Sequence, residues 1–218
     1  MLKLTIDIFL YHGFINGILR LKDQFFQNYL FDKINKVETS EIRINTNLLN
    51  NKLHKWYQPC FFNPVLDGFK YINKVENLAD KEVSFIDLGC GKGKPSIIFS
   101  KIKNEFRNYG IDADPFFQKY FYSNLKKFNK ENYFINLDIN EIKLEKLKSE
   151  IMIVFHMNTL DSSSLLNFIK KYKKIKTKKK YFILYNPEFK KPLKGNELIY
   201  FKKEGWHKLW GLNIYSIK

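Results

Sequence analysis

The chain has 218 residues, of which 17% are aromatic, so it can bury the core of one domain and is not a disordered chain. Its formal net charge of +16 suits a polyanion such as nucleic acid, an acidic glycan or a membrane surface. Only three of the 38 basic residues are arginine, the side chain that best recognises phosphates and bases in pairs of hydrogen bonds. The composition therefore disfavours a dedicated nucleic-acid-binding protein.

The cysteine and histidine residues indicate a protein without a metal site or disulfide. There are two cysteines, Cys60 and Cys90, and four scattered histidines, with no zinc-ligand spacing. Such sparse cysteine usage predicts a reducing compartment, and we expect a cytoplasmic protein. Residues 1–10 lack the pattern of a signal peptide, and no run of residues reaches the apolar length of a transmembrane helix.

The first 50 residues are expected to form a helical segment, either a lid or an appendage, in front of a main domain over residues 51–218. Apolar residues recur at helical spacing at Leu4, Ile8, Tyr11, Ile15 and Ile18. This pattern predicts an amphipathic helix, or two helices broken near Gly13 and Gly17, and a second helical stretch over residues 19–34. We expect the apolar side to pack on the domain. The alternative is a helix that contacts a membrane surface or a partner, helped by Lys3, Arg20 and Lys22.

The stretch VSFIDLGCGKGK, residues 83–94, predicts a site for a nucleotide-like ligand. A short apolar run that suits a buried strand is followed by alternate glycines at Gly89, Gly91 and Gly93. Pro95 then opens a helix, where a proline in the first turn is tolerated. Glycines let a ligand approach the backbone, and the helix start offers unpaired N–H groups. An NAD-binding loop would place a small residue at position 94, which is Lys94, so an NAD-dependent oxidoreductase is the weaker interpretation.

Three carboxylates each close a predicted strand: Asp87, Asp112 and Asp138. Carboxyl ends of parallel strands meet at one edge of a sheet, so we expect these side chains to share a cleft. A carboxylate attracts an ammonium group and repels a pyrophosphate. An acidic side chain at the end of the second strand, Asp112, would accept hydrogen bonds from ribose hydroxyls. The series therefore favours a cationic nucleoside as the ligand.

The pattern Asp-x-Gly-x-Gly-x-Gly at residues 87–93 resembles motif I of the class I S-adenosylmethionine (SAM) methyltransferases. Two further segments, FDKINKVET at residues 31–39 and Tyr57-Gln-Pro59, resemble a bacterial group of these enzymes with undefined substrate. The resemblance implies an α/β, Rossmann-like, seven-stranded, mostly parallel sheet with an antiparallel C-terminal hairpin, helices on both faces and extra N-terminal helices. It implies SAM as the cofactor, held by Tyr57, Asp87, Gly89, Cys90, Gly91, Gly93, Asp112, Asp138 and Ile139.

The apolar run at residues 151–157 predicts a central parallel strand whose end faces the substrate. The resembling group has a Tyr-Asn-Pro-Phe type of sequence here, and this chain keeps Asn158 but has Thr159 and Leu160 instead of Pro and Phe. Asn158 is therefore the candidate substrate-facing residue. His156 is a candidate general base or a buried structural histidine. Tyr185, at the end of the next strand, is a weaker candidate.

The remaining elements complete the expected sheet. Helices are expected over residues 115–128, over 140–147 with Asn140 as its cap, and over 162–174 with Ser162 as its cap. A strand is expected over 181–185, and alternating polarity at 198–202 and 212–217 predicts the antiparallel hairpin. That hairpin distinguishes a methyltransferase sheet from a dehydrogenase sheet.

The functional prediction is a SAM-dependent methyltransferase acting on an N or O acceptor in a small molecule, glycan or protein. A protein-lysine methyltransferase and a non-catalytic SAM-fold binding module are the alternatives. The sequence carries no motif that identifies the acceptor or the oligomeric state, and fold does not settle function.

Overall fold

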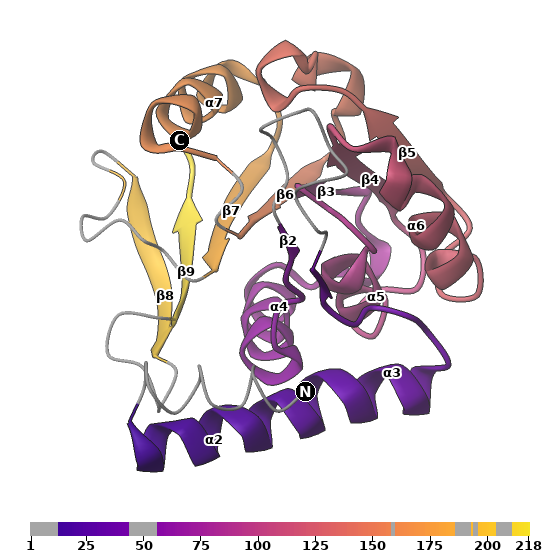
Figure 1. The fold of residues 1–218 in the computed structure, drawn as a ribbon. Coiled ribbons are helices and arrows are strands. Elements are labelled where there is room, and N and C mark those ends of the chain that lie inside the picture. Colours follow the sequence, from indigo (N-terminus) through magenta and orange to yellow (C-terminus); the bar gives the residue numbers. More distant parts are fainter. Residues whose placement is uncertain (1–12, 44–55, 158–159, 186–192, 194–195, 204–210) are drawn as a thin grey trace.

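A computed structural model describes residues 13–43, 56–157, 160–185, 193, 196–203 and 211–218 (Figure 1). Seven strands form one sheet in the order β5-β4-β3-β6-β7-β9-β8. They are β3 (Val83–Leu88), β4 (Arg107–Asp112), β5 (Asn132–Asn136), β6 (Ile151–His156), β7 (Lys179–Tyr185), β8 (Glu197–Lys203) and β9 (Gly211–Ser216). Strands β3 to β7 pair in parallel, whereas β9 pairs antiparallel with β7 and β8. The predicted Rossmann-like sheet with its C-terminal hairpin is confirmed.

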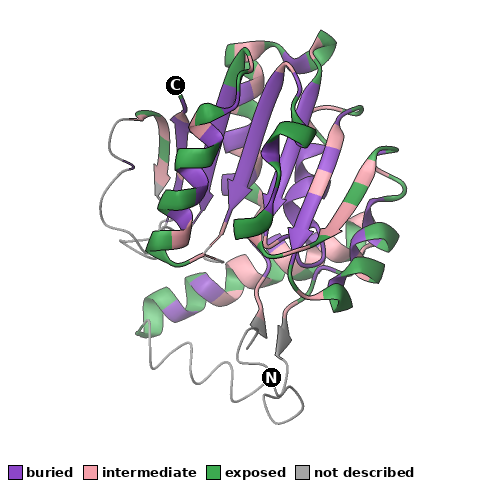
Figure 2. Ribbon diagram, turned by 90° about the horizontal axis from the view of Figure 1, so that it is seen from above, coloured by how far each residue is buried: buried purple, intermediate pink, exposed green. Residues whose placement is uncertain are grey.

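Helices cover both faces of the sheet, which is buried along most of its central strands (Figure 2). One face packs against α4 (Phe62–Glu76), α5 (Lys94–Phe99) and α6 (Gln118–Leu125), and the other against α7 (Ser162–Lys174). Successive side chains of a strand point to opposite faces, so β6 supplies both cores: Ile153 and Phe155 join the first, Met152 and Val154 the second. Burial on both faces explains why β3 and β6 read as continuous apolar runs.

Short turns connect these elements. The 3-10 turns are η3 (Leu78–Asp80), η4 (Pro115–Phe117), η5 (Ile139–Glu141) and η6 (Leu144–Leu147), and a two-stranded ribbon joins β1 (Ile42–Arg43) to β2 (Trp56–Tyr57). The predicted helix over residues 140–147 is wrong, because η5 and η6 stand there instead. Its buried residues Ile142, Leu144 and Leu147 are spaced by two and three positions, which does not sustain one face of an α-helix.

Two predicted helix caps are also wrong by one or two residues. The Asp138 side chain, and not Asn140, caps η5 by accepting from the Asn140 N–H. Asp161 precedes Ser162 and caps α7 by accepting from the N–H groups of Ser163 and Ser164. In both places the carboxylate provides a better acceptor for the exposed N–H groups at the start of the turn or helix.

Within the N-terminal segment, residues 14–35 form one continuous helix, built from α2 (Phe14–Gln24), a π-helical turn η1 (Phe25–Tyr29) and α3 (Leu30–Asn35). The alternative of a break near Gly17 is wrong, since the Gly17 N–H donates to the Gly13 carbonyl at 2.8 Å and the helix continues. Leu4, Ile8, Tyr11 and Lys3 lie outside the described residues. No described helix is long and apolar enough to cross a bilayer.

This helix packs on the domain with its polar side, contrary to the prediction. Ile15 and Ile18 are exposed, whereas Arg20 and Gln27 are buried. The helix lies across the N-terminal ends of α4 and α5, where backbone N–H groups need partners. Gln27 Oε1 accepts from the Asn63 N–H at 3.0 Å in the first turn of α4. The predicted boundary near residue 50 falls in residues 44–55, outside the described chain, so that division stays a prediction.

Candidate cofactor site

The glycine loop between β3 and α5 has the left-handed backbone for which glycine is needed. Gly89, Gly91 and Gly93 have φ values of 71°, 47° and 79°, a region that residues with a Cβ rarely occupy. The Gly89 N–H donates to the Ile111 carbonyl at 2.8 Å, and the Gly93 N–H donates to the Cys90 carbonyl at 2.8 Å. The first bond joins the loop to the end of β4 and the second closes the loop on itself, so the loop is held in a defined turn.

Asp112, the last residue of β4, fixes this turn from the side. Its Oδ2 accepts from the Gly91 N–H at 2.9 Å, and its Oδ1 accepts from the Asp114 N–H at 3.0 Å. The side chain is 6% exposed. Each carboxylate oxygen can accept more than one hydrogen bond, so Asp112 can still accept from a ligand hydroxyl. The predicted carboxylate therefore lies beside the predicted loop.

Asp87 lies at the end of β3, next to Gly110 of β4 in the parallel register. It is 1% exposed, and among the described residues no hydrogen-bond donor reaches its Oδ2. Burial, and then the nearby carboxylate of Asp112, raise the pKa of Asp87 well above its usual value. A buried carboxylate of this kind is costly, and a cationic group placed against it would relieve that cost.

Tyr57, in β2, lies directly on the glycine loop. A Cβ on Gly91 would come within 2.3 Å of the Tyr57 ring carbon Cε2, so only glycine lets the ring approach this closely. The ring also lies 5.4 Å, centroid to centroid, from that of Phe117. Burial raises the pKa of Tyr57 well above 10, and so do Cys60 and Asp87 nearby. Cys90 is buried in the loop, and burial also raises the pKa of its thiol.

Asp138 and Ile139 follow β5 at the same edge of the sheet. Asp112 pairs with Asn136 in the β4–β5 register, so Asp138 lies two residues past that pair. Asp138 is exposed, and its Oδ1 accepts from the backbone and side-chain amides of Asn140 at 2.8 and 3.0 Å. Ile139 is half-buried against the second core. Their contact with the adenine end of a cofactor stays a prediction.

The substrate-side candidates are only partly placed. Asn158 lies outside the described residues. Tyr185, at the end of β7, is 1% exposed, and its hydroxyl accepts from the Phe61 N–H at 3.4 Å. His156 is fully buried on the α7 side of the sheet, and its Nε2 accepts from the Leu160 N–H at 3.1 Å. Burial lowers the pKa of His156 to about 4, which makes it a weak base at neutral pH and argues for the structural alternative.

Two buried lysines of the loop, Lys92 and Lys94, were not predicted as functional. Lys92 Nζ donates to Glu38 Oε1 at 3.0 Å and lies 4.7 Å from the ring centroid of Tyr120. Lys94 Nζ donates to the Gln27 carbonyl at 2.7 Å and to Asn28 Oδ1, with the Phe31 ring centroid 4.7 Å away. Both ammonium groups therefore attach the cofactor loop to the N-terminal segment. The sequence did contain a signal for these contacts: two lysines lie in a turn between apolar, buried elements, and buried charges need partners.

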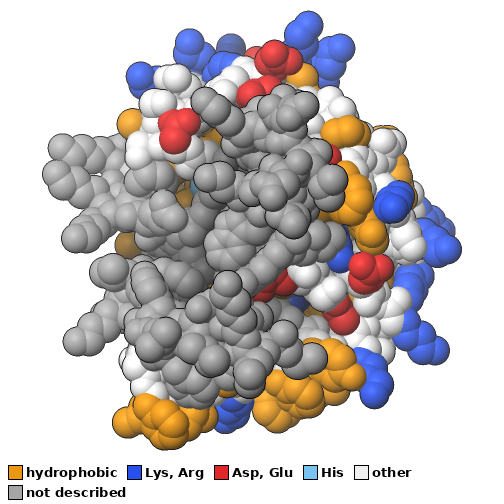
Figure 3. Space-filling view, in the orientation of Figure 1, with side chains coloured by type: hydrophobic (Ala, Val, Ile, Leu, Met, Phe, Trp, Pro, Cys, Tyr) orange, Lys and Arg blue, Asp and Glu red, His pale blue; other side chains and the backbone are white. Residues whose placement is uncertain are grey.

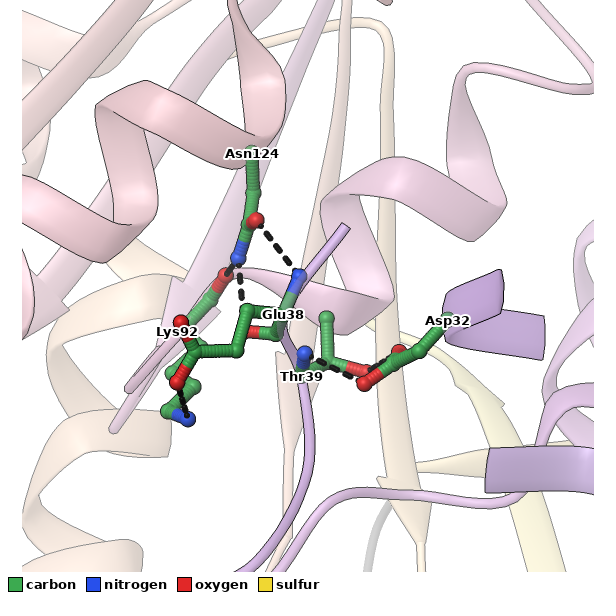
Figure 4. A network of polar contacts seen from close by, with 5 residues as sticks. All are labelled: Asp32, Glu38, Thr39, Lys92 and Asn124. Atoms are coloured by element: carbon green, nitrogen blue, oxygen red, sulfur yellow. Dashed lines mark hydrogen bonds and ion pairs between the residues drawn. The ribbon is translucent and has the colours of Figure 1, made fainter. Parts of the chain in front are cut away.

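Asn124 of α6 joins the same two segments (Figure 4). Its Nδ2 donates to the carbonyls of Glu38 and Lys92, each at 3.0 Å, and its Oδ1 accepts from the Glu38 N–H at 2.9 Å. The buried amide thus satisfies backbone groups of a loop that has no secondary structure of its own. Residues far apart in sequence meet here, so spacing alone could not reveal the contact.

The FDKINKVET segment forms the turn that brings the chain from the N-terminal helix to the loop. The Thr39 N–H donates to Asp32 Oδ2 at 2.7 Å, and the Thr39 hydroxyl donates to Asp32 Oδ1 (Figure 4). The Val37 N–H donates to the Asp32 carbonyl at 3.0 Å, and Phe31 packs against Phe62 with centroids 5.2 Å apart. The spacing of this motif is thus explained by a helix end that docks Glu38 on Lys92.

The residues at this edge of the sheet fit SAM. SAM carries an ammonium and a sulfonium, and the site offers two buried carboxylates, Asp87 and Asp112, at a loop without side chains at Gly89 and Gly91. A pyrophosphate would meet those same carboxylates with repulsion. Among the described residues no cluster of three or more metal-ligating side chains exists.

Comparisons with known proteins support the fold. No protein-family model matches the sequence, and no curated protein matches it either. Among solved structures, the chain is similar to magnesium protoporphyrin IX methyltransferase from Synechocystis PCC 6803 with bound SAM, at 12% identity and a TM-score of 0.53, over 91% of this chain and 96% of that one.

Two further structures show the same likeness. One is an amino pentose methyltransferase from Micromonospora echinaspora with bound SAM, at 11% identity and a TM-score of 0.51, over 72% of this chain and 91% of that one. The other is an RNA methyltransferase from Salinibacter ruber with S-adenosyl-L-homocysteine, at 17% identity and a TM-score of 0.50, over 73% and 94%. The chain therefore has the Rossmann-like fold of class I methyltransferases.

Proposed function

We propose that this protein is a SAM-dependent methyltransferase. The observation that carries the proposal is the buried pair Asp87 and Asp112 around a glycine loop at the carboxyl ends of β3 and β4. In open α/β sheets ligands bind at this edge. The pair favours a cationic ligand, and the fold is one that occurs in structures with bound SAM. The motif similarity at residues 31–39, 57–59 and 87–93 supports the same conclusion.

Each residue has a role that follows from its position. The Asp87 carboxylate would hold the ammonium of the amino-acid end of SAM, and Asp112 would accept from the ribose hydroxyls while holding Gly91. Asp138 and Ile139 would contact the adenine, and Tyr57 would close the loop from above. When bound, SAM supplies a methyl group on a positively charged sulfur, which an N or O nucleophile can attack.

Alignment of the acceptor is the main task left to this chain. Holding two reactants in line can contribute on the order of 7–11 kcal/mol to rate acceleration. His156 has a pKa of about 4 and accepts from Leu160, so we assign it a structural part in holding the end of β6. Asn158 and Tyr185 stay our candidates for acceptor positioning. The two cysteines, both buried and not disulfide-bonded, support a reducing compartment such as the cytoplasm.

Titration calorimetry with SAM, S-adenosyl-L-homocysteine and NAD tests the cofactor. We expect SAM and its demethylated product to bind and NAD not to bind. Replacing Asp87 with Asn should weaken SAM binding by about tenfold or more, because a hydrogen bond to a charged group is lost. Replacing the exposed Asp80 with Asn is the matched control and should change nothing. Binding of NAD in preference to SAM would overturn the proposal.

The acceptor requires a separate experiment. A host lysate incubated with the protein and SAM carrying a tritiated methyl group should show label in a small-molecule, glycan or protein fraction. Label on lysine side chains would select the protein-lysine alternative. Tight SAM binding without transfer to any fraction would select the non-catalytic binding module and reject the enzyme.

A further inference from the structure

The N-terminal helix presents an apolar side to solvent. Six side chains on this side are between 40% and 74% exposed, and they are Ile15, Ile18, Leu19, Phe25, Phe26 and Tyr29, here called the outward face. In Figure 3 hydrophobic side chains gather along the lower edge of the molecule, where α2 and α3 lie in Figure 1. Single exposed apolar residues are normal, but six of them on one side of a helix, with the exposed Lys22 among them, mark an interaction surface.

The opposite side of the helix is fixed to the domain, so the outward face cannot turn inward. Gln27 binds the Asn63 N–H and, through its carbonyl, Lys94. The Arg20 guanidinium carbon lies 5.0 Å from the ring centroid of Phe61, and Phe31 packs on Phe62. Arg20 therefore belongs to the inner side, contrary to the prediction that it would help membrane contact. These contacts hold the apolar stripe outward as a stable feature of the fold.

The charges around the outward face are basic. Lys22 and Lys33 are exposed on the helix. At its C-terminal end Lys101 Nζ donates to Asn35 Oδ1 at 2.8 Å, and Lys127 Nζ donates to the Lys36 carbonyl at 2.7 Å. The acidic residues of the helix have partners of their own: Asp23 accepts from Gln27 and Asp32 from Thr39. Lysines therefore lie on the same side as the outward face and at the C-terminal end of the helix, whereas Asp23 and Asp32, which offset part of this charge, are half-buried.

We infer that the outward face docks on an anionic lipid surface, with the helix lying flat in the headgroup region. A helix with aromatic and aliphatic side chains on one side, and with lysines among and beyond them, matches an interfacial helix. A second copy of this chain is the less suitable occupant, because each copy carries a net charge of +16 and the two would repel. The same charge attracts anionic lipids. This inference does not depend on the methyltransferase proposal.

Vesicle sedimentation tests the inference, with the full chain and vesicles of phosphatidylcholine alone or with about one third phosphatidylglycerol. We expect binding to the anionic vesicles, weaker binding to the neutral ones, and a loss of affinity with added salt. The double variant Phe25→Gln/Phe26→Gln should reduce partitioning by about tenfold or more, since two aromatic rings no longer enter the interface. The control Val75→Gln/Leu166→Gln changes two equally exposed apolar residues elsewhere and should bind as the unmodified protein does.

A second pair of variants tests the charge. Lys22→Gln/Lys33→Gln should weaken binding to anionic vesicles by about fivefold per lysine and leave binding to neutral vesicles unchanged. All substituted side chains are exposed, so unfolding temperatures should stay close to the original value. Equal binding by the Phe25/Phe26 variant and its control would overturn the inference. A lack of binding to both kinds of vesicle would also overturn the inference. If the chain is then a dimer in solution, and the Phe25/Phe26 variant dissociates it, the outward face is assigned to a second copy of the chain.

Discussion

Asp112 Oδ2 accepts a hydrogen bond from the Gly91 N–H at 2.9 Å, which joins the end of β4 to the loop after β3. The residue therefore shapes the glycine loop, and we propose that it also accepts hydrogen bonds from the bound cofactor. Asp112→Ala should weaken SAM binding by about 1–3 kcal/mol and also lower the free energy of unfolding without ligand, because the buried Gly91 N–H loses its partner. Calorimetry and denaturant unfolding measure the two effects.

Asp112→Asn separates these contributions. Its side-chain oxygen can still accept from Gly91, so unfolding should recover most of the lost free energy while SAM binding stays weak. If both Asp112 variants bind SAM as the original protein does, and only Asp112→Ala loses stability, then Asp112 does not contact SAM and only holds the glycine loop in place.

The Asp87 carboxylate is expected to lower the stability of the ligand-free protein and to strengthen SAM binding. It is buried, its pKa is raised, and no described donor reaches its Oδ2. Asp87→Asn removes a buried charge and should raise the unfolding temperature of the ligand-free protein, while SAM binding weakens by about tenfold or more. A core residue important only for packing would lose stability on this substitution instead.

The raised pKa of Asp87 also predicts how the free energy of unfolding changes with pH. Because the pKa of Asp87 is higher in the folded protein, the folded state holds more protons than the unfolded chain above about pH 4. Stability of the ligand-free protein should therefore fall as pH rises from about 4 through the raised pKa. The Asp87→Asn variant should lack this contribution, so the difference between the two unfolding curves should shrink towards low pH. A pH-independent difference would contradict the raised pKa.

Gly91 and Tyr57 should be energetically coupled. Gly91→Ala forces a Cβ to within 2.3 Å of the Tyr57 ring and strains a backbone with φ of 47°. In a Tyr57→Ala background the steric part disappears, and only the backbone strain remains. We expect a double-mutant cycle on the free energy of unfolding to give a coupling of about 1–2 kcal/mol. An additive cycle would show that the ring moves away at no cost.

Much of the sheet could be predicted because its signals are local. The apolar runs of β3 and β6, the glycines at 89, 91 and 93, and Pro95 each restrict the backbone within a few residues. Asp87 and Asp112 were then placed together by one rule, that carboxyl ends of parallel strands share an edge. The register confirms their meeting, since Asp87 pairs with Gly110, two residues before Asp112.

The N-terminal helix could not be predicted in the same way. The spacing of its apolar residues correctly predicts a helix, but the rule that the apolar side of a helix faces the core fails at Ile15 and Ile18, which are exposed. The helix meets the polar ends of α4 and α5, and Lys94, so Gln27 and Asn28 are the side chains that satisfy the contact. These partners lie 36 to 67 residues apart in the sequence, beyond the reach of any local pattern.

Lys94 should give the protein a stability that increases at alkaline pH. Burial lowers the pKa of Lys94 to about 8, whereas an unfolded lysine titrates near 10.4. Between these values the unfolded chain binds more protons than the folded protein, so the free energy of unfolding should rise with pH.

Lys94→Met lacks this group, and the stability of the original protein relative to the variant should grow by on the order of 3 kcal/mol from pH 8 to about 10.5. Lys101→Met, which removes an exposed lysine that follows α5 and contacts Asn35 of the N-terminal helix, is the control for the loss of a lysine. Parallel curves for Lys94→Met would mean that the ammonium stays charged beneath the N-terminal helix, because the Gln27 carbonyl and Asn28 then offset its burial.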